Sequence, residues 1–521
     1  MDEHSYDVVV IGGGNAALCA ALAARENAAR VLVLERAPFG QHGGNTAFTA
    51  GLLRFAFNGN AQILELVPDL SPEMIRDTDF GSYSEESYYE DLGRVTEYRT
   101  DPELAGLLVS RSFETLKWMY GYGVRYVPPY GRQAYKVDGK YTFWGGLVLE
   151  VSGAGQGLVN FLTKAVQAND IDLWYGARGC SLLTEGSRVS GVRIRRDGRD
   201  ETVYADAVVL ACGGFEANAE MRTRYLGPGW DLAKVRGTRY NTGDGIMMAL
   251  DAGAMSWGNW SGAHAVGWDL NAPAFGDLTV GDGFQKHSYP FGIIVNARGE
   301  RFVDEGADFR NYTYAKYGER VLAQPGRFAW QVFDRKISGL LRDEYRIRQV
   351  TKVTGQTLEE LVSKMDGVDP QGFLATVKAF NEAVDDTKTF NPNVKDGRRT
   401  NGLAIDKSNW SNRLDEPPFE AYAITCGITF TFGGLKITAN AEVVDTDGNV
   451  MPGLYACGEL VGGLFYLNYP GGAGLMNGSV FGRIAGSQAA QFAVHDSTAV
   501  PMDLPAQRVG NQMPFTGPAA D

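Results

Sequence analysis

The hydrophobic pattern at the start of the chain predicts a strand, a tight turn, a helix and a second strand. Residues 6–11 form an apolar run of the kind found in strands buried on both faces. Three glycines follow, and the small residues 15–26 predict a helix. A second apolar run, residues 30–35, ends in an acid. This order predicts a βαβ unit in a parallel sheet.

Later segments of the chain alternate between the hydrophobic pattern of helices and that of strands. We predict helices in 60–125 and 335–386, strands at 189–195 and 202–210 around the turn 196–199, and strands at 442–444 and 450–455 around Asp447-Gly448. The glycines at 153–157 mark a helix start, as do a capping box at Thr357 and Glu360 and the pair Asp369-Pro370. The polar residues 387–412 predict a linker, and the tail from Val500 is expected to be extended. A nucleotide-binding domain split by an inserted domain explains this order.

Composition narrows the function classes. The chain has 49 basic and 62 acidic residues, a formal net charge of −13, which argues against nucleic-acid binding. Its five cysteines show no CxxC spacing, so we expect no metal site and no disulfide scaffold, and a reducing cytoplasm fits best. The apolar residues 8–24 follow acids rather than basic residues and are too few to span a bilayer, so no direct membrane insertion is expected.

The turn after the first strand carries a dinucleotide fingerprint, Gly12-x-Gly14-x-x-Ala17. Gly12 permits the tight turn, Gly14 lets a pyrophosphate approach the backbone, and the next helix offers free N–H groups to phosphate. Glu35, at the end of the second strand, can accept from ribose hydroxyls. Further glycine-rich segments predict a second wall for a long dinucleotide: residues 43–46, 211–214, 241–245 and 458–459.

Four longer segments resemble the superfamily of fumarate reductases, succinate dehydrogenases and 3-ketosteroid dehydrogenases, and within it most closely the FAD-dependent tricarballylate dehydrogenases. They are residues 9–17, residues 136–149 (KVDGKYTFWGGLVL), residues 301–314 (RFVDEGADFRNYTY) and residues 468–474 (NYPGGAG). The resemblance implies an α/β fold in which a Rossmann-like FAD-binding domain of the GR2 type is interrupted by an α+β substrate-capping domain. The predicted boundaries are 1–259 and 416–495 for the FAD-binding domain, 260–415 for the capping domain and 496–521 for the tail.

The resemblance also implies the residues that hold the cofactor, FAD. Gly474 and Leu475 open a late helix whose N-terminus would stabilise negative charge on the reduced flavin. Respiratory relatives attach FAD to a histidine where this chain has Asn45, so non-covalent FAD is predicted. The predicted FAD contacts are Gly12, Gly14, Asn15, Ala16, Glu35, Arg36, Gly43, Gly44, Asn45, Thr46, Gly51, Ala211, Gly213, Asp244, Gly458, Glu459, Gly474 and Leu475.

Catalytic candidates also follow from the resemblance. In fumarate reductases an arginine after an R-F-x-x-E run transfers the proton; here Arg310 lies five residues beyond the glutamate rather than four, and Tyr312 and Tyr314 are alternatives. His264 resembles a histidine that binds the substrate carboxylate. Tyr469 stands where fumarate reductases have a carboxylate-binding arginine, in a loop closer to the Tyr-Pro-Gly loop of ketosteroid dehydrogenases, whose tyrosine donates to a ketone oxygen.

Other positions depart from the fumarate reductases. Phe430 replaces a second histidine, and Lys286 and Tyr289 replace the proton relay. The family's arginine at the position of Tyr469 and its histidine at the position of Phe430 are two cationic groups, and their loss removes strong anchors for a carboxylate. Phe430, Gly471 and Gly472 are the predicted substrate contacts, and an aromatic cavity would favour a ring or a longer apolar body.

These observations predict an FAD-dependent dehydrogenase that forms a C=C bond α,β to a carboxylate or ketone. The expected substrate is a tricarballylate-like acid or a cyclic oxo-acid or ketone. The expected electron acceptor is a separate protein, a quinone-linked partner or dioxygen. Two alternatives stay open: an enoate reductase that runs the same site in reverse, and a flavin-binding redox sensor that is not an enzyme.

Overall fold

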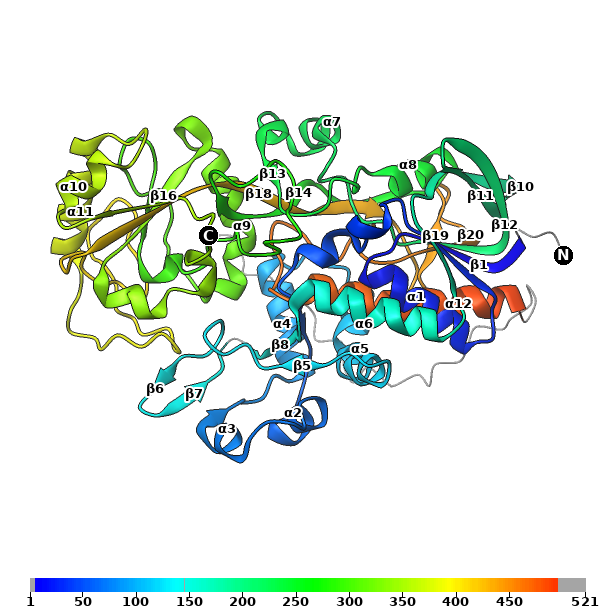
Figure 1. The fold of residues 1–521 in the computed structure, drawn as a ribbon, viewed down its shortest axis with the longest axis horizontal. Helices are drawn as coiled ribbons and strands as arrows, with labels where there is room; N and C mark the ends of the chain where they lie inside the picture. The colour runs from blue at the N-terminus through cyan, green and yellow to red at the C-terminus, as the bar shows by residue number, and fades with distance from the viewer. Residues whose placement is uncertain (1–4, 145, 495–521) are drawn as a thin grey trace, which may run out of the picture.

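The computed structural model describes residues 5–144 and 146–494, which contain two large sheets joined by long strands (Figure 1). Parallel strands form the centre of the first sheet, in the order β9 (Asp172–Trp174), β2 (Val31–Leu34), β1 (Ser5–Ile11), β12 (Arg199–Leu210) and β20 (Val450–Ala456). The antiparallel strands β10 (Arg178–Glu185), β11 (Arg188–Arg196) and β19 (Glu442–Val444) extend it. The predicted βαβ unit and both hairpins are confirmed.

Two helices of small residues, α1 (Asn15–Glu26) and α12 (Ala473–Val494), pack against each other beside this sheet (Figure 1). A Cβ on Gly482 would lie 2.5 Å from the Ala16 carbonyl oxygen, and one on Gly486 would lie 2.0 Å from that of Ala20. Glycine is therefore required for the close approach of the two backbones. The helices α5 (Pro102–Gly121) and α6 (Ala154–Ala168) pack on the same pair.

The second sheet is organised around the 17-residue strand β18 (Phe419–Leu435). It pairs with β13 (Lys234–Val235), β14 (Ser256–Asp269), β16 (Ala329–Phe333) and β17 (Lys352–Gly355), and β15 (Ile293–Val295) extends it beyond β16. The helices α10 (Leu358–Ser363) and α11 (Pro370–Ala383) share a hydrophobic core with its outer end, and α9 (Tyr314–Leu322) packs on β14 and β18. Strand β14 runs across the predicted domain boundary at 259/260, and the predicted tail lies outside the described residues.

The remaining helices and strands are short and lie outside the two large sheets. The helices are α2 (Asn60–Leu66), α3 (Pro72–Asp77), α4 (Glu85–Val95), α7 (Ala219–Met221) and α8 (Asp244–Asp251). One small sheet contains β3 (Leu52–Arg54), β8 (Val148–Val151) and β5 (Tyr126–Val127), and another contains β4 (Thr78–Asp79), β7 (Lys140–Thr142) and β6 (Lys136–Val137). The helical block predicted for 60–125 is thus observed.

Two predictions are wrong in detail. Residues 335–386 are not helical throughout: β17 interrupts them and pairs with β18, and residues 335–340 and 343–345 form only 3-10 turns. Residues 387–412 contain no helix or strand, yet they are not a free linker, because Trp410 is 2% exposed and donates to the Asn391 and Val394 carbonyls. The predicted helix starts are confirmed: Thr357 accepts from the Glu360 N–H, Asp369 accepts from Gln371 and Gly372, and α6 begins at Ala154.

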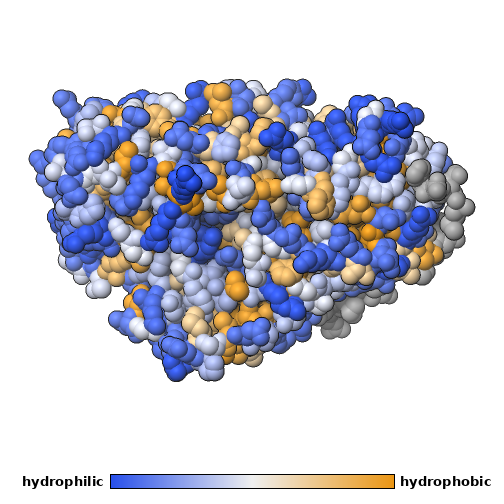
Figure 2. All heavy atoms as spheres, viewed as in Figure 1, coloured by the Kyte–Doolittle hydropathy of each residue, from blue (hydrophilic) through white to orange (hydrophobic). Residues whose placement is uncertain are grey.

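Polar and hydrophobic residues are interspersed on the face that Figure 2 displays. Within the described ranges, no helix has both the length and the apolar character needed to cross a membrane.

Candidate flavin and substrate site

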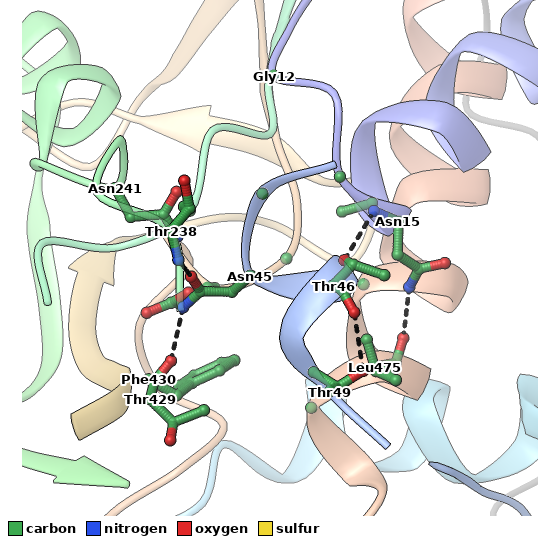
Figure 3. A pocket seen from close by; sticks show the side chains of 18 of the residues that line it. Gly12, Asn15, Asn45, Thr46, Thr49, Thr238, Asn241, Thr429, Phe430 and Leu475 are labelled. Carbon is green, nitrogen blue, oxygen red and sulfur yellow. Dashed lines mark hydrogen bonds between the residues drawn. The ribbon is translucent and has the colours of Figure 1, made fainter. Parts of the chain in front are cut away.

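The fingerprint turn shapes one wall of a long cavity. Gly12 has φ +124°, and a Cβ there would lie 2.3 Å from the Ala211 carbonyl oxygen. A Cβ on Gly14 would meet nothing closer than 3.4 Å, so the chain leaves open space beside the start of α1. The Asn15 N–H donates to Thr46 Oγ1 at 3.0 Å (Figure 3), which brings the second glycine segment to the same helix end. A pyrophosphate fits this cradle of N–H groups.

Asn15 also connects the two helix starts that face the cavity. Its side-chain amide donates to the Leu475 carbonyl at 2.8 Å and to Ser479 at 2.9 Å, so α12 begins beside α1 (Figure 3). Gly474 and Leu475 line the cavity at this end of α12. The positive ends of two helix dipoles therefore face the same space.

The acid after β2 is buried. Glu35 is 5% exposed and accepts from the Ala37 N–H at 2.6 Å. Burial raises the pKa of its carboxyl group to about 7, although the N–H groups of Ala37, Gly43 and Gly13 act in the opposite direction. Beside it, Arg36 contacts Asp244 at 2.9 Å, so the two predicted contacts lie together at this wall.

Most of the predicted FAD contacts line this one cavity: Gly12, Gly14, Asn15, Ala16, Glu35, Arg36, Gly44, Asn45, Thr46, Ala211, Gly213, Asp244, Gly458, Glu459, Gly474 and Leu475. Gly43 and Gly51 are not among its lining residues. A Cβ on Gly43 would lie 2.8 Å from Val159, and one on Gly51 would lie 2.7 Å from the Ala154 backbone. These two glycines therefore shape the loop behind the wall.

Asn45 is held by hydrogen bonds from both sides (Figure 3). Its amide donates to the Thr429 carbonyl at 2.8 Å and to Glu216 at 2.5 Å, and its oxygen accepts from the Thr238 N–H at 2.9 Å. A carboxamide engaged in this way offers no nucleophile for attachment to a flavin.

Two tyrosines that line the cavity share a hydrogen bond. The hydroxyls of Tyr314 and Tyr469 are 2.7 Å apart, and burial raises the pKa of both. The ring of His264 lies 4.6 Å from that of Tyr469 between centroids, and burial, followed by the charge of Arg236, holds its pKa well below 6.5. His264 is therefore neutral, and one of its ring nitrogens is a donor.

Arg310 borders the same space. It is 7% exposed, its carbon Cζ lies 5.6 Å from the centroid of the Tyr314 ring, and its Nη2 has no hydrogen-bond partner in the described ranges. Burial, and then the charge of Arg342, lowers its pKa to about 10. Tyr312 takes a different position: its hydroxyl donates to Asp91 at 2.6 Å, and it does not line the cavity.

Of the three predicted substrate contacts, Phe430 and Gly472 line the cavity, whereas Gly471 does not. Phe465 packs on Tyr469 and Phe430 from behind. Lys286 and Tyr289, at the family's relay positions, also lie outside the lining: Lys286 Nζ is 3.7 Å from Asp269, and the Tyr289 hydroxyl bonds Thr313 at 2.6 Å.

Among the cavity residues that were not predicted from the sequence, Arg236, His287 and Arg342 bear most on the chemistry of the site. Arg236 forms an ion pair with Asp282 at 2.6 Å, and both groups are buried. The cavity therefore keeps cationic groups despite the two family positions that lost them. None of the three lies in a recognisable motif, and the scarcity of histidine, five in the whole chain, is the one sequence signal that could have pointed to His287.

Comparison with known families agrees with this geometry. A family described as FAD binding domain matches residues 7–475. The chain belongs to this family. FAD is thus its cofactor, and the chain is an FAD-dependent oxidoreductase. The resemblance to the fumarate reductase and 3-ketosteroid dehydrogenase superfamily is confirmed, and the closer likeness to tricarballylate dehydrogenases stays a prediction.

The alignments with individual relatives cover almost the whole chain. A fumarate reductase (cytochrome) of Shewanella frigidimarina is 29% identical over 498 residues, which cover 94% of this chain and 78% of that protein. A 3-oxosteroid 1-dehydrogenase of Mycobacterium tuberculosis is 25% identical over 580 residues, covering 93% and 98%. Among solved structures, the open conformation of a flavocytochrome c3 fumarate reductase aligns with a TM-score of 0.69 at 25% identity, covering 94% of this chain and 79% of that one.

Proposed function

We propose that this protein is an FAD-dependent dehydrogenase that forms a C=C bond α,β to a carboxylate or ketone of a small-molecule substrate. One observation carries the proposal: the buried pair of Tyr469 and Tyr314 hydroxyls lies in one cavity with His264 and Arg310. The relatives include a fumarate reductase and a 3-oxosteroid 1-dehydrogenase, and their names support the same class of reaction.

The reaction removes one hydride and one proton from neighbouring carbons. Bound FAD supplies the hydride acceptor. The proton needs a base, and the enolate-like oxygen that develops needs hydrogen-bond donors. Tyr469 is a suitable donor, because its hydroxyl is held by Tyr314 and stays protonated at neutral pH. Neutral His264 is a second donor beside it.

Arg310 is the preferred base, with Tyr314 as the alternative. Burial and the charge of Arg342 make the Arg310 guanidinium easier to deprotonate than an exposed one, since both penalise its charged form. Tyr312 is less suited, because its hydroxyl is already bound to Asp91 outside the cavity.

The reverse reaction, reduction of an enoate, is the second candidate, because relatives include a fumarate reductase and a vinyl phenol reductase. We further propose that FAD is bound without a covalent link, that electrons leave to a separate protein, a quinone-linked partner or dioxygen, and that the protein works in the cytoplasm.

Anaerobic flavin spectroscopy tests the proposal. The holoenzyme is mixed with saturated mono-, di- and tricarboxylic acids, a cyclohexanone carboxylate and a 3-ketosteroid. Loss of the oxidised-flavin absorbance with one of these compounds is the expected result. If none reduces the flavin but an enoate reoxidises chemically reduced enzyme, the reductase assignment replaces the dehydrogenase. If neither occurs, the proposal is refuted.

A further inference from the structure

Arg342 has a buried guanidinium group whose donors are unused. The residue is 4% exposed, and its Nε, Nη1 and Nη2 atoms have no hydrogen-bond partner among residues 5–144 and 146–494. It lines the same cavity as Tyr469 and Arg310. A buried charged group without hydrogen bonds is costly, and a bound anion would supply the missing acceptors.

The nearest acid does not satisfy these donors. Glu344 Oε1 is 3.1 Å from Arg342 Nε, but both atoms are among the buried atoms that lack a hydrogen bond, because their geometry is poor. Glu344 therefore balances charge without using the outer edge of the guanidinium. Arg236 is the useful contrast: its Nε and Nη2 reach Asp282 at 2.7 and 2.6 Å, and its Nη1 donates to Thr429.

A second unused donor lies nearby. His287 is 2% exposed, and within the described residues neither ring nitrogen has a partner. Its ring centroid is 4.9 Å from that of Tyr314. Burial, and then the charges of Arg310 and Arg342, keep its pKa well below 6.5, so the ring is neutral and has one N–H to donate.

These donors are distinct from the phosphate cradle. The cradle lies at the start of α1, whereas His287 packs against Tyr314, and Arg342 interacts electrostatically with His287 and Arg310. A guanidinium edge and an imidazole N–H match the planar, two-oxygen geometry of a carboxylate.

We propose that Arg342 and His287 form a carboxylate subsite, so that the substrate carries a second carboxylate besides the group activated at Tyr469. This inference rests on the proposed function and specifies its substrate class as acids with two or more carboxylates. The subsite would favour such acids over the ketones and steroids that the tyrosine loop alone would allow.

Equilibrium binding to the oxidised holoenzyme tests the subsite without turnover. Flavin difference spectra report the Kd of succinate, glutarate and adipate, with butyrate as the monocarboxylate. For the dicarboxylate that binds most tightly, Arg342→Met is expected to raise Kd about 10- to 100-fold, the range of a lost charge-assisted hydrogen-bonded pair. The Kd of butyrate is expected to change less than about twofold, because butyrate does not use the subsite.

Two further variants control for folding and for general charge. Arg346→Met removes a cation on the same segment whose side chain is 56% exposed, and should leave both Kd values unchanged. Arg342→Lys keeps the charge but loses the planar edge, and should recover only part of the affinity. FAD content equal to that of the parent protein verifies folding.

The subsite is refuted if Arg342→Met weakens both ligands equally or neither, or if the parent enzyme binds no dicarboxylate more tightly than butyrate. This result is separable from the proposed function. Dicarboxylates can bind through Arg342 even if no acid reduces the flavin, and a ketone can reduce the flavin even if Arg342 has no effect.

Discussion

Tyr469→Phe tests the proposed oxygen-polarising role with a small perturbation. The substitution removes one hydroxyl and keeps the ring, which packs against His264 and Phe465 with centroid distances of 4.6 and 5.3 Å. It breaks one hydrogen bond, to Tyr314, which costs about 1 kcal/mol. Since domains are stable by ~5–15 kcal/mol, the variant should fold and bind FAD.

The effect on turnover should be far larger than the effect on stability. Because burial and the neighbouring Tyr314 raise the pKa of Tyr469 well above 10, its hydroxyl remains a donor across the working pH range. Removal of one donor to a developing oxyanion costs about 2.7–4 kcal/mol, or ~10²–10³ in rate. The charge on the substrate oxygen grows only toward the transition state, so kcat should fall more than KM rises.

Anaerobic rapid mixing measures the effect of Tyr469→Phe as the rate of flavin reduction at saturating substrate. Tyr466→Phe is a matched control, because that tyrosine is on the same loop, is half-buried and does not line the cavity. A Tyr469→Phe enzyme that retains FAD and reduces its flavin within about threefold of the parent rate would show that Tyr469 is not the donor.

Three further predictions concern the cofactor site and the fold. Acid or urea denaturation followed by ultrafiltration should release all flavin from the chain, since Asn45 offers no nucleophile; yellow colour retained on the protein would contradict this. In the FAD-free protein, Glu35 has a pKa of about 7, against 4.5 for an unperturbed glutamate. The folded state therefore keeps this proton to a higher pH than the unfolded state does, and the free energy of unfolding should fall by up to ~3 kcal/mol as the pH rises between these two values. Urea unfolding of Glu35→Gln should show a smaller fall, and an identical one would exclude Glu35 as the cause. Gly486→Ala should lower thermal stability by about 1–3 kcal/mol, because its Cβ meets the Ala20 carbonyl, whereas Gly106→Ala, with open space, should not; equal melting temperatures would refute this packing argument.

The flavin end of the site was predictable because its chemistry is local in sequence. Gly12, Gly14 and Glu35 lie within one βαβ unit, where turn geometry, helix dipole and strand end are fixed by neighbouring residues. The substrate end is assembled differently. Arg236, His287 and Arg342 come from separate irregular segments far apart in the sequence, so their spacing along the chain carries no periodic signal.

The errors in secondary structure have a similar origin. Lys352–Gly355 is a four-residue strand between helical segments, and only its pairing with β18 stabilises it as a strand. In the predicted linker, Lys407 is fully buried and donates to the Gly292 carbonyl at 2.6 Å. Polar composition predicted exposure, but tertiary hydrogen bonds satisfy these groups inside the fold.

Product analysis after a single anaerobic turnover tests the central claim most directly. The oxidised enzyme is mixed with an excess of the acid that reduces it, and flavin reduced and product formed are both counted, the product by NMR. The account predicts one new C=C bond, α,β to a carboxylate or ketone, for each flavin reduced. An alcohol oxidised to a ketone, or flavin reduced without any new double bond, would contradict it.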